Sequence, residues 1–87
     1  MSATGKSSFR EKLDKIHQWP SLYMFKFIVP KGKEDQVKQL FPKNVLTEKQ
    51  SRTGKYVSIT AKVMMSSADA VVDIYESASE IEELIAL

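Results

Sequence analysis

The 87-residue sequence contains no cysteine. Disulfide bonds, thiolate chemistry and cysteine-based zinc sites are therefore excluded, and a reducing compartment suits the composition. Histidine is almost as scarce, because His17 is the only one. It has no evident partner for acid–base chemistry, so a surface role is favoured over a catalytic one.

Long apolar runs are also missing. No stretch approaches the roughly 20 apolar residues that a membrane-spanning helix needs. The N-terminal residues MSATGKSSFREKLDK lack the apolar segment of a secretory signal peptide. We therefore expect a cytoplasmic protein of one small domain with no membrane partner.

Charge is present but unevenly distributed. Residues 1–62 hold all thirteen bases and five acids, a net charge of +8, whereas residues 63–87 hold six acids and no base. Such asymmetry can steer partners or orient self-association. Chance clustering on a solvated surface is the alternative interpretation.

The first half of the chain predicts two helices around one strand. Residues 1–8 are small and polar, and we expect them to be a disordered tail. Apolar residues at helical spacing predict a helix over 9–18, ended by Pro20. Residues 21–29 are rich in aromatic and β-branched residues with two apolar faces, which predicts a central strand. A second helix is predicted over 33–41, ended by Pro42.

The second half predicts three strands and one helix. Residues 45–51 are polar and indicate an edge strand, and residues 56–64 alternate as a half-buried strand does. Ser66 or Ser67 can cap a third helix that runs to Ala78. We expect the closing residues 81–87 to form the last strand.

The predicted order after the leading helix is βαββαβ. Two interleaved βαβ units give an α+β, ferredoxin-like plait over residues 9–87. Its four-stranded antiparallel sheet has the order 4-1-3-2, with two helices on one face and an extra N-terminal helix. The predicted core is formed by Tyr23, Phe25, Phe27, Val57, Ile59 and Val63 of the sheet with Val37, Leu40, Phe41, Val71, Val72 and Tyr75 of the helices.

The stretch SRTGKYVSIT, residues 51–60, contains a Gly-Lys pair that suggests a phosphate-binding loop. That motif needs a glycine at position 49 and a hydroxyl residue at 56, where the sequence has Lys49 and Tyr56. We therefore interpret Gly54 as the positive-φ residue of a hairpin turn. Arg52 and Lys55 in this turn remain candidates for anion binding.

Catalytic and metal-binding constellations are not evident. An acylphosphatase-type site resembles an arginine-bearing loop after the first strand, but residues 30–33 read PKGK. Glu80, Glu82 and Glu83 lack the mixed ligand spacing of a metal site. We expect no enzyme activity, no metal and no cofactor.

Interaction with a partner is the function that remains. The sheet face opposite the core carries a candidate interaction surface of Leu22, Met24, Lys26, Ile28, Tyr56 and Met64. The apolar edge at 81–87 invites pairing with another chain, including a second copy. The leading helix is an alternative cover for the open face. A nucleic-acid-binding module using Lys26, Lys49, Arg52, Lys55 and Lys62 is the less favoured interpretation, because the aromatic residues of the first strand share the core face.

Several motifs together resemble the YbeD-like family of small bacterial proteins of unknown function. They are Trp19-Pro20 before a strand that carries Lys26, the stretch S-x-x-G-K-Y-x-S-I-T from Ser51 to Thr60, Tyr75 and the closing Leu87. The resemblance covers about residues 12–87. It implies a ferredoxin-like fold similar to ACT regulatory domains, which bind small effectors between paired subunits. Pro30, Lys31 and Gly32 would then be candidate effector-binding residues, and no catalytic residues are implied.

Overall fold

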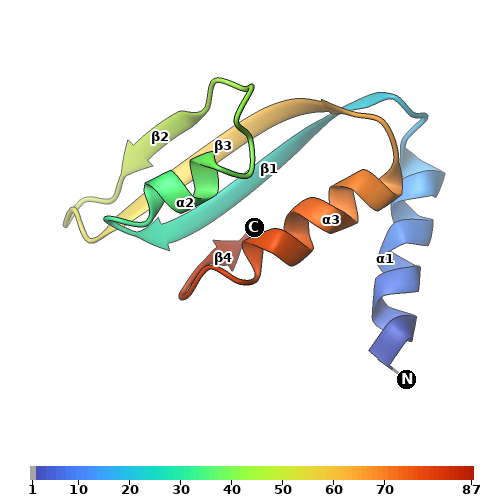
Figure 1. Ribbon diagram of the computed structural model, residues 1–87, viewed down its shortest axis with the longest axis horizontal. Helices are drawn as coiled ribbons and strands as arrows, with labels where there is room; N and C mark the ends of the chain where they lie inside the picture. The colour runs from blue at the N-terminus through green and yellow to red at the C-terminus, as the bar shows by residue number, and fades with distance from the viewer. Residues whose placement is uncertain (1) are drawn as a thin grey trace.

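The computed structural model describes residues 2–87, with side chains described from Ser8 onward. Its three helices and four strands follow one another in the predicted order (Figure 1). The elements are α1 (Ser2–Ile16), β1 (Ser21–Pro30), α2 (Glu34–Lys38), β2 (Thr47–Gln50), β3 (Tyr56–Met65), α3 (Ala68–Ala78) and β4 (Ile85–Ala86).

The four strands form one antiparallel sheet in the order β2-β3-β1-β4. This is the predicted order read from the opposite edge. The α+β class, the central place of β1 and the edge position of β2 are therefore confirmed. Both α2 and α3 lie on the same side of the sheet (Figure 1).

The pairing of β1 with β3 is the longest in the sheet. It runs without a break from Ser21 opposite Met65 to Pro30 opposite Tyr56. Side chains alternate between the two faces of a strand, so the aromatic residues Phe25 and Phe27 point together toward the helices. The apolar positions of β3 follow the same alternation.

The core lies between the sheet and its helices. Phe25 and Phe27 are fully buried, and the Phe41 ring lies 5.2 and 6.4 Å from theirs. The predicted core is confirmed for Phe25, Phe27, Phe41, Val37, Val57, Ile59, Val71 and Val72. Tyr23, Leu40, Val63 and Tyr75 are only partly buried and pack against that core.

The start of α1 differs from the prediction. Residues 2–8 are helical, whereas the sequence analysis expected a disordered tail over 1–8 and a helix starting at Phe9. Met1 lies outside the described residues. The physical reason is that extending an existing helix costs little compared with nucleating one, and no proline interrupts this segment.

The predicted helix over 33–41 is also longer than the observed α2, which ends at Lys38. Beyond that point, the N–H groups of Leu40 and Phe41 donate to the carbonyls three residues back, at 3.0 Å each. This tighter winding accompanies the burial of Phe41, which is 4% exposed. The predicted strand over 45–51 is likewise shortened to Thr47–Gln50, and Val45 before it is fully exposed.

The last strand is the largest correction. The sequence analysis predicted a strand over 81–87, but β4 contains only Ile85 and Ala86. Ile81 is 8% exposed and Leu84 packs against the core, so the chain must turn directly after α3. Glu83 makes that turn with a φ of 63°, in the left-handed region.

The turn between β2 and β3 has the predicted form. Gly54 has a φ of 75°, and its N–H donates to the Ser51 carbonyl at 2.9 Å. Ser51 also pairs with Tyr56 through both its backbone N–H and its hydroxyl, which accepts from the Tyr56 N–H at 3.2 Å. The Ser51-x-x-Gly54 motif is therefore explained by hairpin geometry.

A matched pair of substitutions tests the assignment of the two sheet faces. Ile59 is 0% exposed and Ile85 is 52% exposed. We expect Ile59→Val to lower the free energy of unfolding by about 0.5–1.5 kcal/mol, because it leaves a cavity in the core. Ile85→Val should change it by less than about 0.5 kcal/mol. Urea denaturation measures both, and equal losses would contradict the assignment.

A second pair tests the turn. Space is open around Gly54, so a Cβ there meets no atom and the cost of substitution comes from the backbone conformation alone. We expect Gly54→Ala to lower the free energy of unfolding by about 1 kcal/mol. Gly54→Asn should cost less, since asparagine tolerates the left-handed region. If chemical denaturation finds the asparagine variant as destabilised as the alanine variant, the conformational explanation is wrong.

Candidate interaction surface

The face of the sheet turned away from α2 and α3 is the candidate site, and we call it the open face. Strand alternation and register decide which side chains belong to it. Its members are Leu22, Met24, Lys26 and Ile28 of β1, Tyr56, Ser58, Thr60, Lys62 and Met64 of β3, Thr47 and Lys49 of β2, and Ile85 of β4. All six residues of the predicted interaction surface lie on this face.

Several exposed apolar side chains lie next to one another on the open face. Leu22 and Met64 lie opposite each other across β1 and β3, with 59% and 63% of their surface exposed. Met24 is 57% exposed, and Ile28 lies opposite Ile85 of β4. Contiguous exposed apolar patches, unlike scattered apolar residues, are typical of interaction sites.

The charge on the open face has one sign. Lys26, Lys49 and Lys62 project from β1, β2 and β3, and no acidic residue of the four strands accompanies them. Glu48, the only strand carboxylate, points the other way and accepts from Lys38 of α2 at 2.8 Å. This contact raises the pKa of Lys38. The face is therefore apolar and cationic together.

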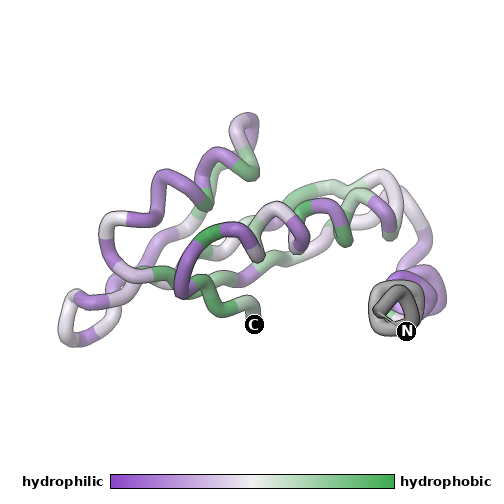
Figure 2. Tube along the Cα trace, turned by 60° about the horizontal axis from the view of Figure 1, so that its bottom comes forward, coloured by the Kyte–Doolittle hydropathy of each residue, from purple (hydrophilic) through white to green (hydrophobic). Residues whose placement is uncertain are grey.

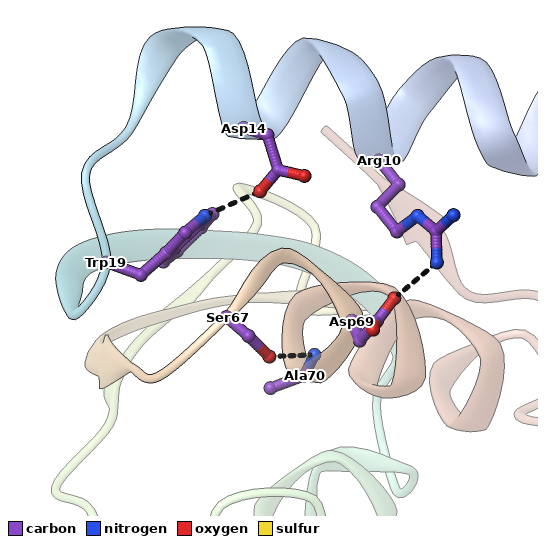
Figure 3. Close-up of polar contacts among 6 residues, drawn as sticks. All are labelled: Arg10, Asp14, Trp19, Ser67, Asp69 and Ala70. Carbon is purple, nitrogen blue, oxygen red and sulfur yellow. Dashed lines mark hydrogen bonds and ion pairs between the residues drawn. The ribbon is translucent and has the colours of Figure 1, made fainter.

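The leading helix does not cover this face. Arg10 of α1 donates to Asp69 of α3 at 3.1 Å (Figure 3). The Phe9 and Tyr75 rings of the same two helices meet edge to face at 5.6 Å. The bond to Asp69 raises the pKa of Arg10. Ser67, one of the two predicted caps of α3, accepts from the Ala70 N–H at 3.1 Å beside this contact (Figure 3). Helix α1 thus packs against α3, and the alternative cover is wrong.

The part of α1 that carries hydropathy colour is mostly hydrophilic, and the chain beside the C-terminus is hydrophobic (Figure 2). Hydrophobic residues of that C-terminal segment remain exposed, with Ile85 at 52% and Leu87 at 64%. The Leu87 N–H donates to the Lys26 carbonyl at 2.9 Å, so the segment continues along β1 past the end of β4. It therefore extends the apolar part of the surface at the sheet edge.

Two loops meet at one end of the sheet. The Lys31 N–H donates to the Lys55 carbonyl at 2.9 Å, which ties the loop after β1 to the β2–β3 turn. The structure thereby brings the predicted residues Pro30, Lys31 and Gly32 to the same end as Arg52 and Lys55. The cluster is basic, and its binding role stays a prediction.

The amide of Gly32 already has an acceptor. Its N–H donates to the Glu34 carboxylate, and Glu34 also accepts from its own backbone N–H. These bonds, the one from its own backbone first, lower the pKa of Glu34. Lys33 is likewise paired, with Glu82 at 3.4 Å. Carboxylates of this chain, Glu34 in the loop and Glu82 after α3, thus already pair with the loop, which does not require a bound anion.

A shallow cavity joins the open face to the turn. It has a volume of about 280 Å³ and lies over the end of β1, β2 and β3. Its lining residues are Ile28, Lys49, Gln50, Ser51, Arg52, Tyr56 and Ser58. The sequence analysis did not name Gln50, Ser51 or Ser58 as site residues. Ser51 and Ser58 belong to the S-x-x-G-K-Y-x-S motif, which was the available signal.

The junction of α1 and β1 holds the sole histidine. His17 Nδ1 lies 3.0 Å from the Ser21 hydroxyl, and its ring is tilted against Trp19 and Tyr23 at 5.2 and 5.6 Å. His17 is therefore partly buried and has a hydrogen-bonding neighbour that the sequence analysis did not name. Trp19 in turn donates to Asp14 of α1 at 2.9 Å (Figure 3). These contacts join the end of α1 to β1.

Beside this junction, between the sheet and α3, two tyrosines meet. The hydroxyls of Tyr23 and Tyr75 lie 3.1 Å apart, and both residues are partly buried. Burial first, and then the bond to Tyr23, raises the pKa of Tyr75. The neutral phenol is therefore the form that the fold favours.

Alkaline titration tests this pair. The unfolded chain ionises Tyr75 near the ordinary tyrosine pKa of about 10, whereas the folded chain keeps it neutral to higher pH. Stability from this difference is fully present below pH ~10 and is lost as the pH rises above it. We expect the unfolding free energy of the wild type to fall more steeply there than that of Tyr75→Phe, measured by urea denaturation. Parallel curves would contradict the assignment.

Within residues 2–87 no helix is long and apolar enough to cross a bilayer. The described side chains include no group of three or more His, Asp or Glu residues placed to hold a metal ion. No curated protein and no solved structure matches the chain. Residues 14–87 match the model of a family described as a protein of unknown function (DUF493), and the chain belongs to this family, the YbeD-like family.

Proposed function

We propose that this domain works by binding a protein partner on its open face, as a small regulatory or adaptor domain, and not by catalysis. The observation that carries the proposal is the difference between the two faces of one sheet. One face is covered by α2 and α3, whereas the other exposes Leu22, Met24 and Met64 by more than half. Covering such residues contributes roughly 25 cal/mol per Å² of apolar area.

The specific fold type is part of the same proposal. We infer a ferredoxin-like plait, supported by the strand order β2-β3-β1-β4 with α2 and α3 on one side of the sheet. In an ACT-like arrangement, an effector would lie near Pro30, Lys31 and Gly32. Because the Gly32 amide is already bonded to Glu34, a macromolecular partner on the open face is better supported than a small effector in this loop. A cytoplasmic location suits the absence of cysteine.

Nucleic-acid binding is the second candidate, and the lysines of the open face favour it. Lys26, Lys49 and Lys62 share the face with no strand carboxylate, and Arg52 and Lys55 lie at its end. Single-stranded nucleic acids bind by stacking on several aromatic side chains. Tyr56 is the only aromatic residue that the strands place on the open face. The protein partner is therefore preferred.

Photo-crosslinking in the native cell tests the proposed function. A photoreactive phenylalanine analogue replaces Met24 on the open face or, as the matched control, the exposed Asp73 on α3. We expect irradiation to attach a protein at position 24 and not at position 73, because only the open face is the binding surface. Denaturing gel electrophoresis and mass spectrometry identify the adduct.

Each other result has a defined meaning. Nucleic acid attached at position 24 would support the second candidate against the first. Adducts at both positions in equal yield, or at neither, would contradict binding through the open face. An adduct of twice the chain mass would identify the partner as a second copy.

A further inference from the structure

We propose that the partner segment is an acidic amphipathic helix, supplied by another protein, that lies along β1 on the open face. The inference rests on the proposed function and adds the chemistry of the partner. It is based on the separation of apolar and cationic side chains on the open face. Leu22, Met24 and Ile28 follow β1, whereas Lys62 and Lys49 lie on β3 and β2 beside it.

The apolar row continues onto both neighbours of β1. Met64 of β3 lies opposite Leu22 at one end, and Ile85 of β4 lies opposite Ile28 toward the other. From Leu22 to Ile28 the row is about 20 Å long at 3.3 Å per residue. A helix of about 13 residues spans that length, and one of about 20 residues covers the row completely. Its width of about 10 Å reaches across the adjacent strands, which are about 4.8 Å apart.

The lysines would meet one flank of that helix. Lys62 lies opposite Met24, and Lys49 lies opposite Ser58, one strand farther from the apolar row. Lys26 stands within the row itself, where its methylene stem can lie on apolar groups while its ammonium group reaches outward. With no strand carboxylate on this face, acidic groups of a partner find cations and no repulsion. Such complementary charges speed association, orient the partner and disfavour partners of the same sign.

The same charges disfavour a symmetric pair of this chain. A second copy that binds through the same face brings the same lysines and no strand carboxylate to the interface. Like charges left uncompensated within one interface cost affinity. Methionines at positions 24 and 64 suit a foreign helix better, because their flexible side chains adapt to different apolar surfaces.

The test uses two synthetic peptides of about 20 residues and the full-length protein. Both peptides carry the same leucine stripe at helical spacing, and their polar positions are all glutamate in one and all lysine in the other. Fluorescence anisotropy measures their affinities, with a single-stranded oligonucleotide as a third probe. We expect the glutamate peptide to bind at least about tenfold more tightly than the lysine peptide, and more tightly than the oligonucleotide at physiological salt.

Charge reversals locate the binding. Lys62→Glu and, independently, Lys49→Glu should each weaken the glutamate peptide by at least about fivefold, because each turns attraction into repulsion. Lys12→Glu is the matched control on the exposed surface of α1 and should leave the affinity unchanged. Thermal denaturation confirms that each variant is folded, and the second reversal keeps the test valid if the first does not fold.

The outcomes separate the two proposals. Equal affinity for both peptides, an equal loss in Lys12→Glu, or preference for the oligonucleotide would overturn the acidic-helix inference. If photo-crosslinking at Met24 still attaches a protein, the proposed function survives that result. If Met24→Asp leaves the affinity of the glutamate peptide unchanged, the peptide does not bind the open face and the inference fails. A dimer that forms through the open face and excludes the peptide would overturn it as well.

Discussion

The pairing of β1 with β3 is the constraint on which the rest of the structure depends. Its uninterrupted register, from Ser21 opposite Met65 to Pro30 opposite Tyr56, decides the direction of every side chain in the middle of the sheet. It orients Phe25 and Phe27 toward α2 and α3, and it aligns Leu22 with Met64 on the opposite face. The edge strands β2 and β4 are short and take their places from this central pair.

Much of this arrangement is predictable from local patterns. The alternation in residues 56–64 and the aromatic period in 21–29 identify the two long strands, because burial of one face imposes a period of two. The order of elements then limits the topology. The open face could be named in advance for the same reason, since its residues are the complement of the core set.

The errors lie where tertiary contacts override local patterns. The final segment contains a strand-like run, but burial of Ile81 and Leu84 requires a turn at Glu83, and this shortens β4 to two residues. No local sequence signal predicts a left-handed backbone conformation at a glutamate. The sequence analysis missed two contacts, the one between His17 and Ser21 and the one from Arg10 of α1 to Asp69 of α3. Both depend on how the chain runs between its helices and strands. The cavity beside the turn likewise requires three strands in register.

The two faces of β1 also differ in how well they tolerate substitutions. Substitutions at Leu22, Met24 or Lys26 alter a surface without disturbing packed neighbours, so recognition can drift while stability is held constant. Insertions into β1, by contrast, disturb the core. A single residue added within β1 shifts the pleat by one position and exchanges Phe25 and Phe27 with their solvent-facing neighbours. Evolution can therefore change the side chains on the open face of β1 but not the length of the strand.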